Sequence, residues 1–142
     1  MSQQPAITAQ DWLEKALQER LAAQTLANAA LWAQAFYHAG FAIECALKHL
    51  IMRRHGWNAW PDRARVREIY THDLIFLAQE AGIAAQLDRE LEQRSEVAVA
   101  WLIVKDWKND LRYDPLPFPE LRARDMVAAL DERGLLAWLI KR

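Results

Sequence analysis

The stretch ALWAQAFYHAGFAIECALKHLIMRRHG, residues 30–56, decides the fold of this chain. It contains no proline and consists mostly of residues that favour the α-helix. Apolar side chains recur in it at the three- and four-residue spacing of one helical face. That face consists of Trp32, Phe36, Ala39, Ile43, Leu47 and Leu50. Gly56 suits the position just after a helix, so the pattern predicts one long helix over residues 30–55.

The residues before this stretch predict a helix of their own. Thr8, followed three residues later by Asp11, is a typical helix start, with the acidic side chain near the positive end of the helix dipole. Asn28 is the expected break before the long helix. The apolar stripe of this first helix is predicted to consist of Trp12, Leu13, Ala16, Leu17, Leu21 and Ala22.

The residues after the long helix continue the pattern. Thr71, His72 and Asp73 form the expected cap of a third helix, which ends at Gly82. A further amphipathic segment follows over residues 83–93. No linker or internal repeat separates these segments.

The C-terminal third predicts a buried helix, an extended segment and a last helix. Ser95 caps a helix that is apolar on almost every side, so we expect it to be buried and to run to about Leu111. Three prolines over residues 115–119 restrict their neighbours and keep that segment extended. A helix over residues 120–133 then ends before Gly134.

A short closing turn over residues 135–140 completes the chain. The 142 residues include only four glycines, and the alternation typical of strands is almost absent. We therefore predict an all-α protein, an antiparallel up-and-down bundle of four to five helices. It forms a single domain over residues 1–142, with its core over about residues 9–141.

Composition excludes several classes of protein. Lys and Arg number 18 against 19 Asp and Glu, and this balance argues against a protein that coats duplex DNA or an anionic membrane. The single cysteine, Cys45, permits neither an intramolecular disulfide nor a multi-thiolate zinc site. No segment resembles a spanning helix or a signal peptide. We expect a cytoplasmic protein with no membrane contact, no cofactor and no metal.

Polar residues on the long helix are candidates for a site. Glu44 and Lys48 stand four residues apart in the better order for a helical ion pair. They predict either a solvent-exposed pair or a carboxylate that faces an internal groove and is paired there. His38 and His49 also share a stripe with Cys45, but about 16 Å of helix separates the two histidines, too far for one metal ion.

A basic run precedes the proline-rich segment. Lys105, Lys108 and Arg112 share a helical face in the predicted buried helix, and Tyr113 follows them. They predict either an ordinary charged helix end or an edge that faces a phosphate, with Arg112 as a forked donor and Tyr113 as a stacking ring.

Three segments together resemble the HEPN family, the higher-eukaryote and prokaryote nucleotide-binding domain. The carrying residues are Ala35–Lys48, the run Thr71-His72-Asp73-Leu74 with Leu77-Ala78, and Leu111-Arg112-Tyr113-Asp114. With their order and spacing, they cover the chain from about Ala30 to Trp138. The resemblance implies an antiparallel bundle of four or five helices that is commonly a homodimer. Family members include metal-independent RNases, toxin partners of nucleotidyltransferases, and non-catalytic nucleotide- or RNA-binding domains.

The chain departs from the family's RNase motif, an arginine followed after four to six residues by a histidine. The motif belongs where this chain has Lys108 to Asp114, and no histidine follows Arg112. Arg67 and His72 fit the spacing, but they lie before the predicted third helix. Loss of the proton-transferring histidine removes roughly 10²–10⁴-fold of rate. The resemblance therefore implies a non-catalytic branch.

Three functions remain open at this point. The first is a dimeric, non-catalytic domain that holds a nucleotide, an RNA end or a nucleotidyltransferase partner, the last as in toxin–antitoxin-type systems. The second is a metal-independent RNase that uses a displaced histidine, His72 or His38, with Arg112. The third is a helical assembly protein. For the first, the expected binding residues are Glu44, Lys48, His72, Lys108, Arg112 and Tyr113.

A homodimer is expected from the residues as well. Seven tryptophans and the apolar helix over residues 97–104 are more apolar surface than one small domain needs to hide. A two-fold dimer, the commonest symmetry, would cover it.

Overall fold

The computed structural model describes residues 6–64, 66–108 and 117–142, and the described residues form helices, turns and irregular segments without a β-strand. The all-α prediction is confirmed. The described part of the chain holds seven α-helices and one 3₁₀ helix, more elements than the four to five predicted. They are α1 (Ala9–Asn28), α2 (Trp32–His55), the 3₁₀ helix η1 (Arg67–Ile69), α3 (Leu74–Glu80), α4 (Ala84–Gln93), α5 (Glu96–Val104), α6 (Glu120–Ala128) and α7 (Leu135–Ile140).

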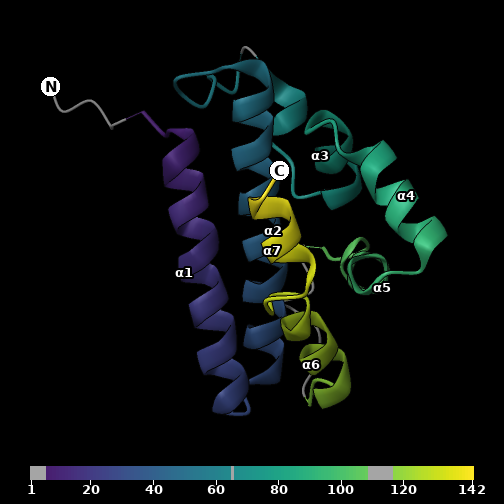
Figure 1. Cartoon of the computed structure of the whole chain (residues 1–142). Helices are drawn as coiled ribbons and strands as arrows, with labels where there is room; N and C mark the ends of the chain where they lie inside the picture. The colour runs from purple at the N-terminus through teal and green to yellow at the C-terminus, as the bar shows by residue number, and fades with distance from the viewer. Residues whose placement is uncertain (1–5, 65, 109–116) are drawn as a thin grey trace, which may run out of the picture.

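Helices α1 and α2 form a long antiparallel hairpin (Figure 1). A capping box begins α1: Thr8 Oγ1 accepts from the Asp11 backbone N–H, and the Asp11 carboxylate accepts from the Thr8 N–H. The helix ends at Asn28, as predicted. Helix α2 ends at Gly56, whose φ of 67° lies in the left-handed region that glycine adopts without strain.

Helix α2 is the centre of the core, because α1, α3, α6 and α7 all pack on it. The segments 42–52 of this helix are buried without a break. Residues 57–64 and 66–73 lie at the end of the hairpin, and α3, α4 and α5 follow to one side of α2 (Figure 1). A helix that is packed on so many sides has little contact with water. Polar residues within it therefore need hydrogen-bond or ion-pair partners in the protein.

Helix α5 is shorter and more exposed than predicted. It ends at Val104 rather than near Leu111, and the chain turns so that the indole of Trp107 is buried against α2. Lys105 and Lys108 therefore do not continue a helical face. The prediction of a buried helix is also wrong, because α5 packs on α4, α6 and α7 along one side and exposes the other. Its solvent-exposed apolar side chains are Val99, Leu102 and Ile103.

Two other predictions need correction. On α1 the side chains of Leu17 and Leu21 are exposed, and the buried residues of that helix are Trp12, Ala16 and Ala23. Helix α6 ends at Ala128 instead of continuing to residue 133. The chain folds back after it, and the carbonyl of Ala129 accepts from the Leu136 N–H in α7.

Gly40 of α2 makes room for Trp107. A β-carbon added at Gly40 would lie 2.1 Å from Cε2 of the Trp107 indole, well inside van der Waals contact. Trp107 itself is 3% exposed. The missing side chain at position 40 thus fixes where the segment after α5 docks on α2.

We expect Gly40→Ala to destabilise the protein by about 1–3 kcal/mol, the usual cost of overpacking a core. At an ordinary helix position the same change stabilises by about 1 kcal/mol, so the sign is diagnostic. Denaturant unfolding measures it. In the Trp107→Leu background the cost should shrink, and an equal cost in both backgrounds would contradict the contact.

Candidate functional site

Glu44 and Lys48 form a buried ion pair in the middle of α2. Glu44 is 1% exposed, the Lys48 side chain is 8% exposed, and Lys48 Nζ lies 3.0 Å from Glu44 Oε2. Of the two interpretations of this pair, the solvent-exposed one is wrong. Burial of the carboxylate carries a large desolvation cost, so both of its oxygens need strong partners.

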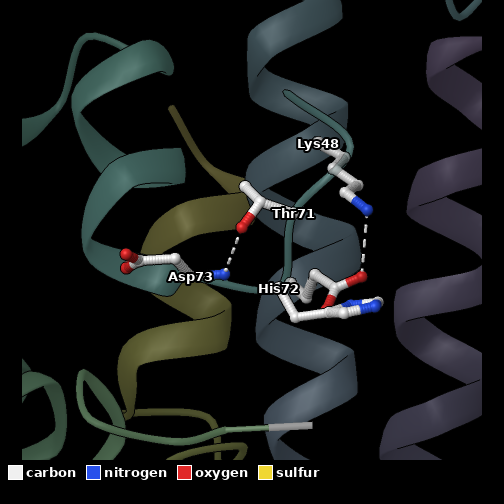
Figure 2. A network of polar contacts seen from close by, with 5 residues as sticks. Lys48, Thr71, His72 and Asp73 are labelled. Carbon is white, nitrogen blue, oxygen red and sulfur yellow. Dashed lines mark hydrogen bonds and ion pairs between the residues drawn. The ribbon is translucent and has the colours of Figure 1, made fainter. Parts of the chain in front are cut away.

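His72 is the second partner of Glu44. Its Nδ1 lies 2.6 Å from Glu44 Oε1, while the His72 side chain is 47% exposed (Figure 2). Because an ionised carboxylate only accepts hydrogen bonds, Nδ1 carries the proton of this contact. The other ring nitrogen, Nε2, stays outside it. The pair thus joins a buried charge to a ring that meets solvent.

The cap of α3 holds His72 in place. Asp73 Oδ1 accepts from the backbone N–H groups of Ile75 and Phe76, at 3.0 and 3.2 Å, and Thr71 Oγ1 accepts from the Asp73 N–H at 3.1 Å. Figure 2 shows His72 beside Thr71 and Asp73, in front of α2. The predicted cap at residues 71–73 is confirmed, and it gives the histidine a fixed backbone.

Lys48 lies beneath two tryptophan rings. Its Nζ is 5.1 Å from the ring centroid of Trp12 and 5.7 Å from that of Trp60. The electron-rich faces of both rings attract the ammonium group, and they exclude water from its bond with Glu44. Lys48 is therefore a buried partner of Glu44, and its ammonium group does not reach a ligand at the surface.

A pocket of about 390 Å³, which we call the His72 pocket, opens beside the histidine. It lies between the start of α3 and the segment that follows α5. Its lining residues are Thr71, His72, Asp73, Ile75, Lys105, Asp106, Trp107 and Lys108. The pocket is therefore lined by one imidazole ring and two ammonium groups, and part of its wall is apolar.

The two acidic residues of the pocket are already engaged. Asp73 caps α3, and Asp106 lies 3.0 Å from Lys105 Nζ. Within the described residues Lys108 forms no ion pair, and it is exposed. The pocket thus offers the ammonium group of Lys108, with no free carboxylate among its lining residues, next to the imidazole of His72.

The predicted site residues divide into three groups. His72 and Lys108 line one pocket, and Glu44 and Lys48 support it from within α2. Arg112 and Tyr113 lie outside the described residues. Lys105 was not among the predicted binding residues, although the sequence places it in the same basic run, and the structure puts it in the pocket.

Other candidates do not join this pocket. The Nδ1 atom of His38 contacts the Glu19 carboxylate of α1, and His38 is not among the described residues that line the His72 pocket. Burial, and next the charge of Glu44, raise the pKa of the Cys45 thiol to about 12, so it is protonated and unreactive at neutral pH. The described residues contain no group of three His, Cys, Asp or Glu side chains placed to hold a metal ion.

Comparison of the chain with protein-family models, with curated proteins and with solved structures gives no match. Among the described residues, no helix has the length and apolar character needed to cross a membrane.

We expect Glu44→Gln to destabilise the protein by about 3–5 kcal/mol, because it leaves the Lys48 ammonium buried without a counter-charge. Glu120→Gln is the matched control. Glu120 and Arg124 form the same four-residue pair at 2.9 Å, but both side chains are more than half exposed. That control should cost less than about 0.5 kcal/mol in denaturant unfolding. Similar losses from the two variants would show that the buried pair has no special role.

Proposed function

We propose that this chain is a HEPN-like domain that binds the phosphate group of a nucleotide or of an RNA end in the His72 pocket, without catalysis. One observation carries the proposal: a buried carboxylate, Glu44, holds a half-exposed imidazole at the wall of a pocket that also contains Lys105 and Lys108. Charge-assisted donors of this kind are the usual partners of phosphate oxygens.

The geometry favours an anionic ligand for a physical reason. The Glu44 carboxylate is already engaged, since one oxygen lies next to His72 Nδ1 and the other accepts from Lys48 Nζ. An incoming phosphate supplies the counter-charge that Lys108 lacks among the described residues. Binding then places a negative charge beside the lysine ammonium groups that line the pocket.

A second candidate is an RNase that uses His72, and the contact with Glu44 favours it. A carboxylate that binds Nδ1 fixes the tautomer of the ring, which leaves Nε2 to accept the proton of a ribose 2′-hydroxyl as that oxygen attacks the phosphorus. The leaving 5′-oxygen then takes its proton from water or from a lysine of the pocket. His38 has no comparable place, because it is not among the described residues of this pocket.

The proposed protein partners come from two sources. The HEPN resemblance alone suggests a nucleotidyltransferase in a toxin–antitoxin-type system. The exposed face of α5 suggests a second copy of the chain, since Val99, Leu102 and Ile103 are 55%, 52% and 39% exposed. Val99 and Ile103 also border a groove of about 570 Å³. A surface of this kind is typical of an interface. If the His72 pocket binds no ligand, the assembly-protein interpretation is favoured.

For the pocket, we expect His72→Asn and Lys108→Gln each to weaken binding of a nucleotide or a short RNA by about 1.5–3 kcal/mol, the worth of a charged hydrogen bond. Isothermal titration of each variant measures this. Arg89→Gln, an exposed change on α4, is the charge-matched control and should bind as the wild type does.

The same incubations with RNA, analysed for product, separate the two candidate functions. Intact RNA with normal binding supports the non-catalytic domain, whereas cleavage that disappears in His72→Asn supports the RNase. Equal affinity of wild type and both variants would contradict a site at this pocket.

For assembly, we expect the wild-type protein to sediment at the mass of a two-fold dimer at tens of micromolar and Leu102→Asp to sediment as a monomer. A charge at the centre of an apolar interface cannot be solvated there. Leu121→Asp is the control, because Leu121 lies on α6 and is 71% exposed. A wild-type monomer, or dissociation by the control as well, would contradict an interface on α5.

A further inference from the structure

One end of the molecule concentrates positive charge, although the chain as a whole has a formal net charge of −1. We call it the basic end. It lies where the C-terminal turn of α2, residues 57–64 and 66–70, and the residues after α7 meet (Figure 1). Its exposed basic residues are Arg53, Arg54, Arg63, Arg67, Lys141 and Arg142.

The charges of the basic end are only partly offset, since Asp62 and Glu68 are the exposed carboxylates among its described residues. Arg53 Nη1 donates to the backbone oxygen of Arg142 at 3.1 Å, and Arg54 Nη1 donates to the carbonyl of Glu80 at 2.8 Å. The Glu80 carbonyl carries no net charge, so this hydrogen bond leaves the charge of the Arg54 guanidinium in place. Among the described residues, none of the six basic side chains forms an ion pair with a carboxylate.

Aromatic rings run through the same surface. His55 stacks on Trp57 with centroids 4.5 Å apart and planes 14° apart. Trp57 contacts Trp60, which contacts Tyr70, at centroid distances of 6.4 and 6.1 Å. The Arg63 guanidinium lies 5.9 Å from the Tyr70 centroid. His55 and Tyr70 are exposed, so rings as well as cations meet the solvent here.

Stabilisation of the fold explains only part of this pattern. Cations in the last turn of α2 interact favourably with the negative end of the helix dipole, which accounts for Arg53 and Arg54. Lys141, the residue that ends α7, has the same explanation. The helix dipole does not account for Arg63 and Arg67, which line a hollow of about 490 Å³ together with Asp62. The six exposed cations outnumber the exposed carboxylates Asp62 and Glu68, and this excess of positive charge favours an anionic partner.

We propose that the basic end binds single-stranded nucleic acid, with its phosphates on the arginines and its bases against the exposed rings of His55 and Tyr70. Cations interleaved with aromatic rings are the combination that single strands need, because every base has a face that stacks. An anionic membrane fits less well. The exposed large apolar residues described near this end are Ile7 and Tyr70. Of these two, Ile7 alone has an aliphatic side chain for insertion into a bilayer. The inference is independent of phosphate binding in the His72 pocket.

The test measures binding of a fluorescein-labelled twelve-residue oligouridylate by fluorescence anisotropy over a range of salt concentrations. The test variant is Arg63→Gln/Arg67→Gln/Lys141→Gln. Loss of three phosphate contacts should lower the slope of log K against log salt by about 2, at about 0.7 per contact for single strands. That change corresponds to a loss of affinity on the order of 100-fold at 0.1 M salt.

The matched control is Arg89→Gln/Arg94→Gln/Arg133→Gln, which removes the same charge from exposed positions away from the basic end. It should keep the wild-type slope. Circular dichroism and thermal unfolding establish that both triple variants fold. Nucleotide titration reports on the other site: the test variant should keep the wild-type affinity for a nucleotide, so failure of one proposal is distinguishable from failure of the other.

Three results would overturn the inference. One is equal loss of oligouridylate binding in both triple variants, or no binding by the wild type. Another is displacement of the oligouridylate by heparin as effective as that by unlabelled oligouridylate of equal charge, since heparin has no bases to stack. The last is binding to phosphatidylserine vesicles that the test variant abolishes while oligouridylate binding stays unchanged.

Discussion

The Glu44 carboxylate lies at the centre of the most buried helix and binds Lys48 with one oxygen and His72 with the other. A charge in that position is tolerated only with both partners, so the contact ties the segment before α3 to the middle of α2. The capping hydrogen bonds of Asp73 then determine where α3 begins. One electrostatic requirement thus links the core, the path of the chain after α2 and the position of the imidazole at the surface.

The gap at Gly40 is the second constraint on the site. It admits the indole of Trp107, which brings the segment after α5 onto α2 and places Lys105 and Lys108 opposite His72. The chemistry of the pocket therefore depends on a residue that has no chemistry of its own. The pocket thus depends both on the packing of Trp107 against Gly40 and on the ionic partners of the buried Glu44 carboxylate.

Charge and apolar surface are distributed unevenly on a chain that is nearly neutral overall. The basic end gathers arginines around exposed rings, and the outer face of α5 gathers uncharged aliphatic side chains. Net charge describes neither surface, because association depends on local fields and on contiguous patches. The side chains of both surfaces are exposed and are not part of the core. Contact with a partner there requires no change in the packing of the core.

The sequence by itself determined the helical class, the long helix ending at Gly56, and the caps at Thr8, Asp73 and Ser95. These features are local, since caps and periodicity depend on neighbours within one or two turns. The sequence also singled out Glu44, Lys48 and His72 as candidates for a site. Only the tertiary structure decided that the Glu44–Lys48 pair is buried, that α5 ends at Val104 and exposes one face, and that Lys105 joins the pocket. Each depends on contacts between residues far apart in the chain, which spacing along one helix does not encode.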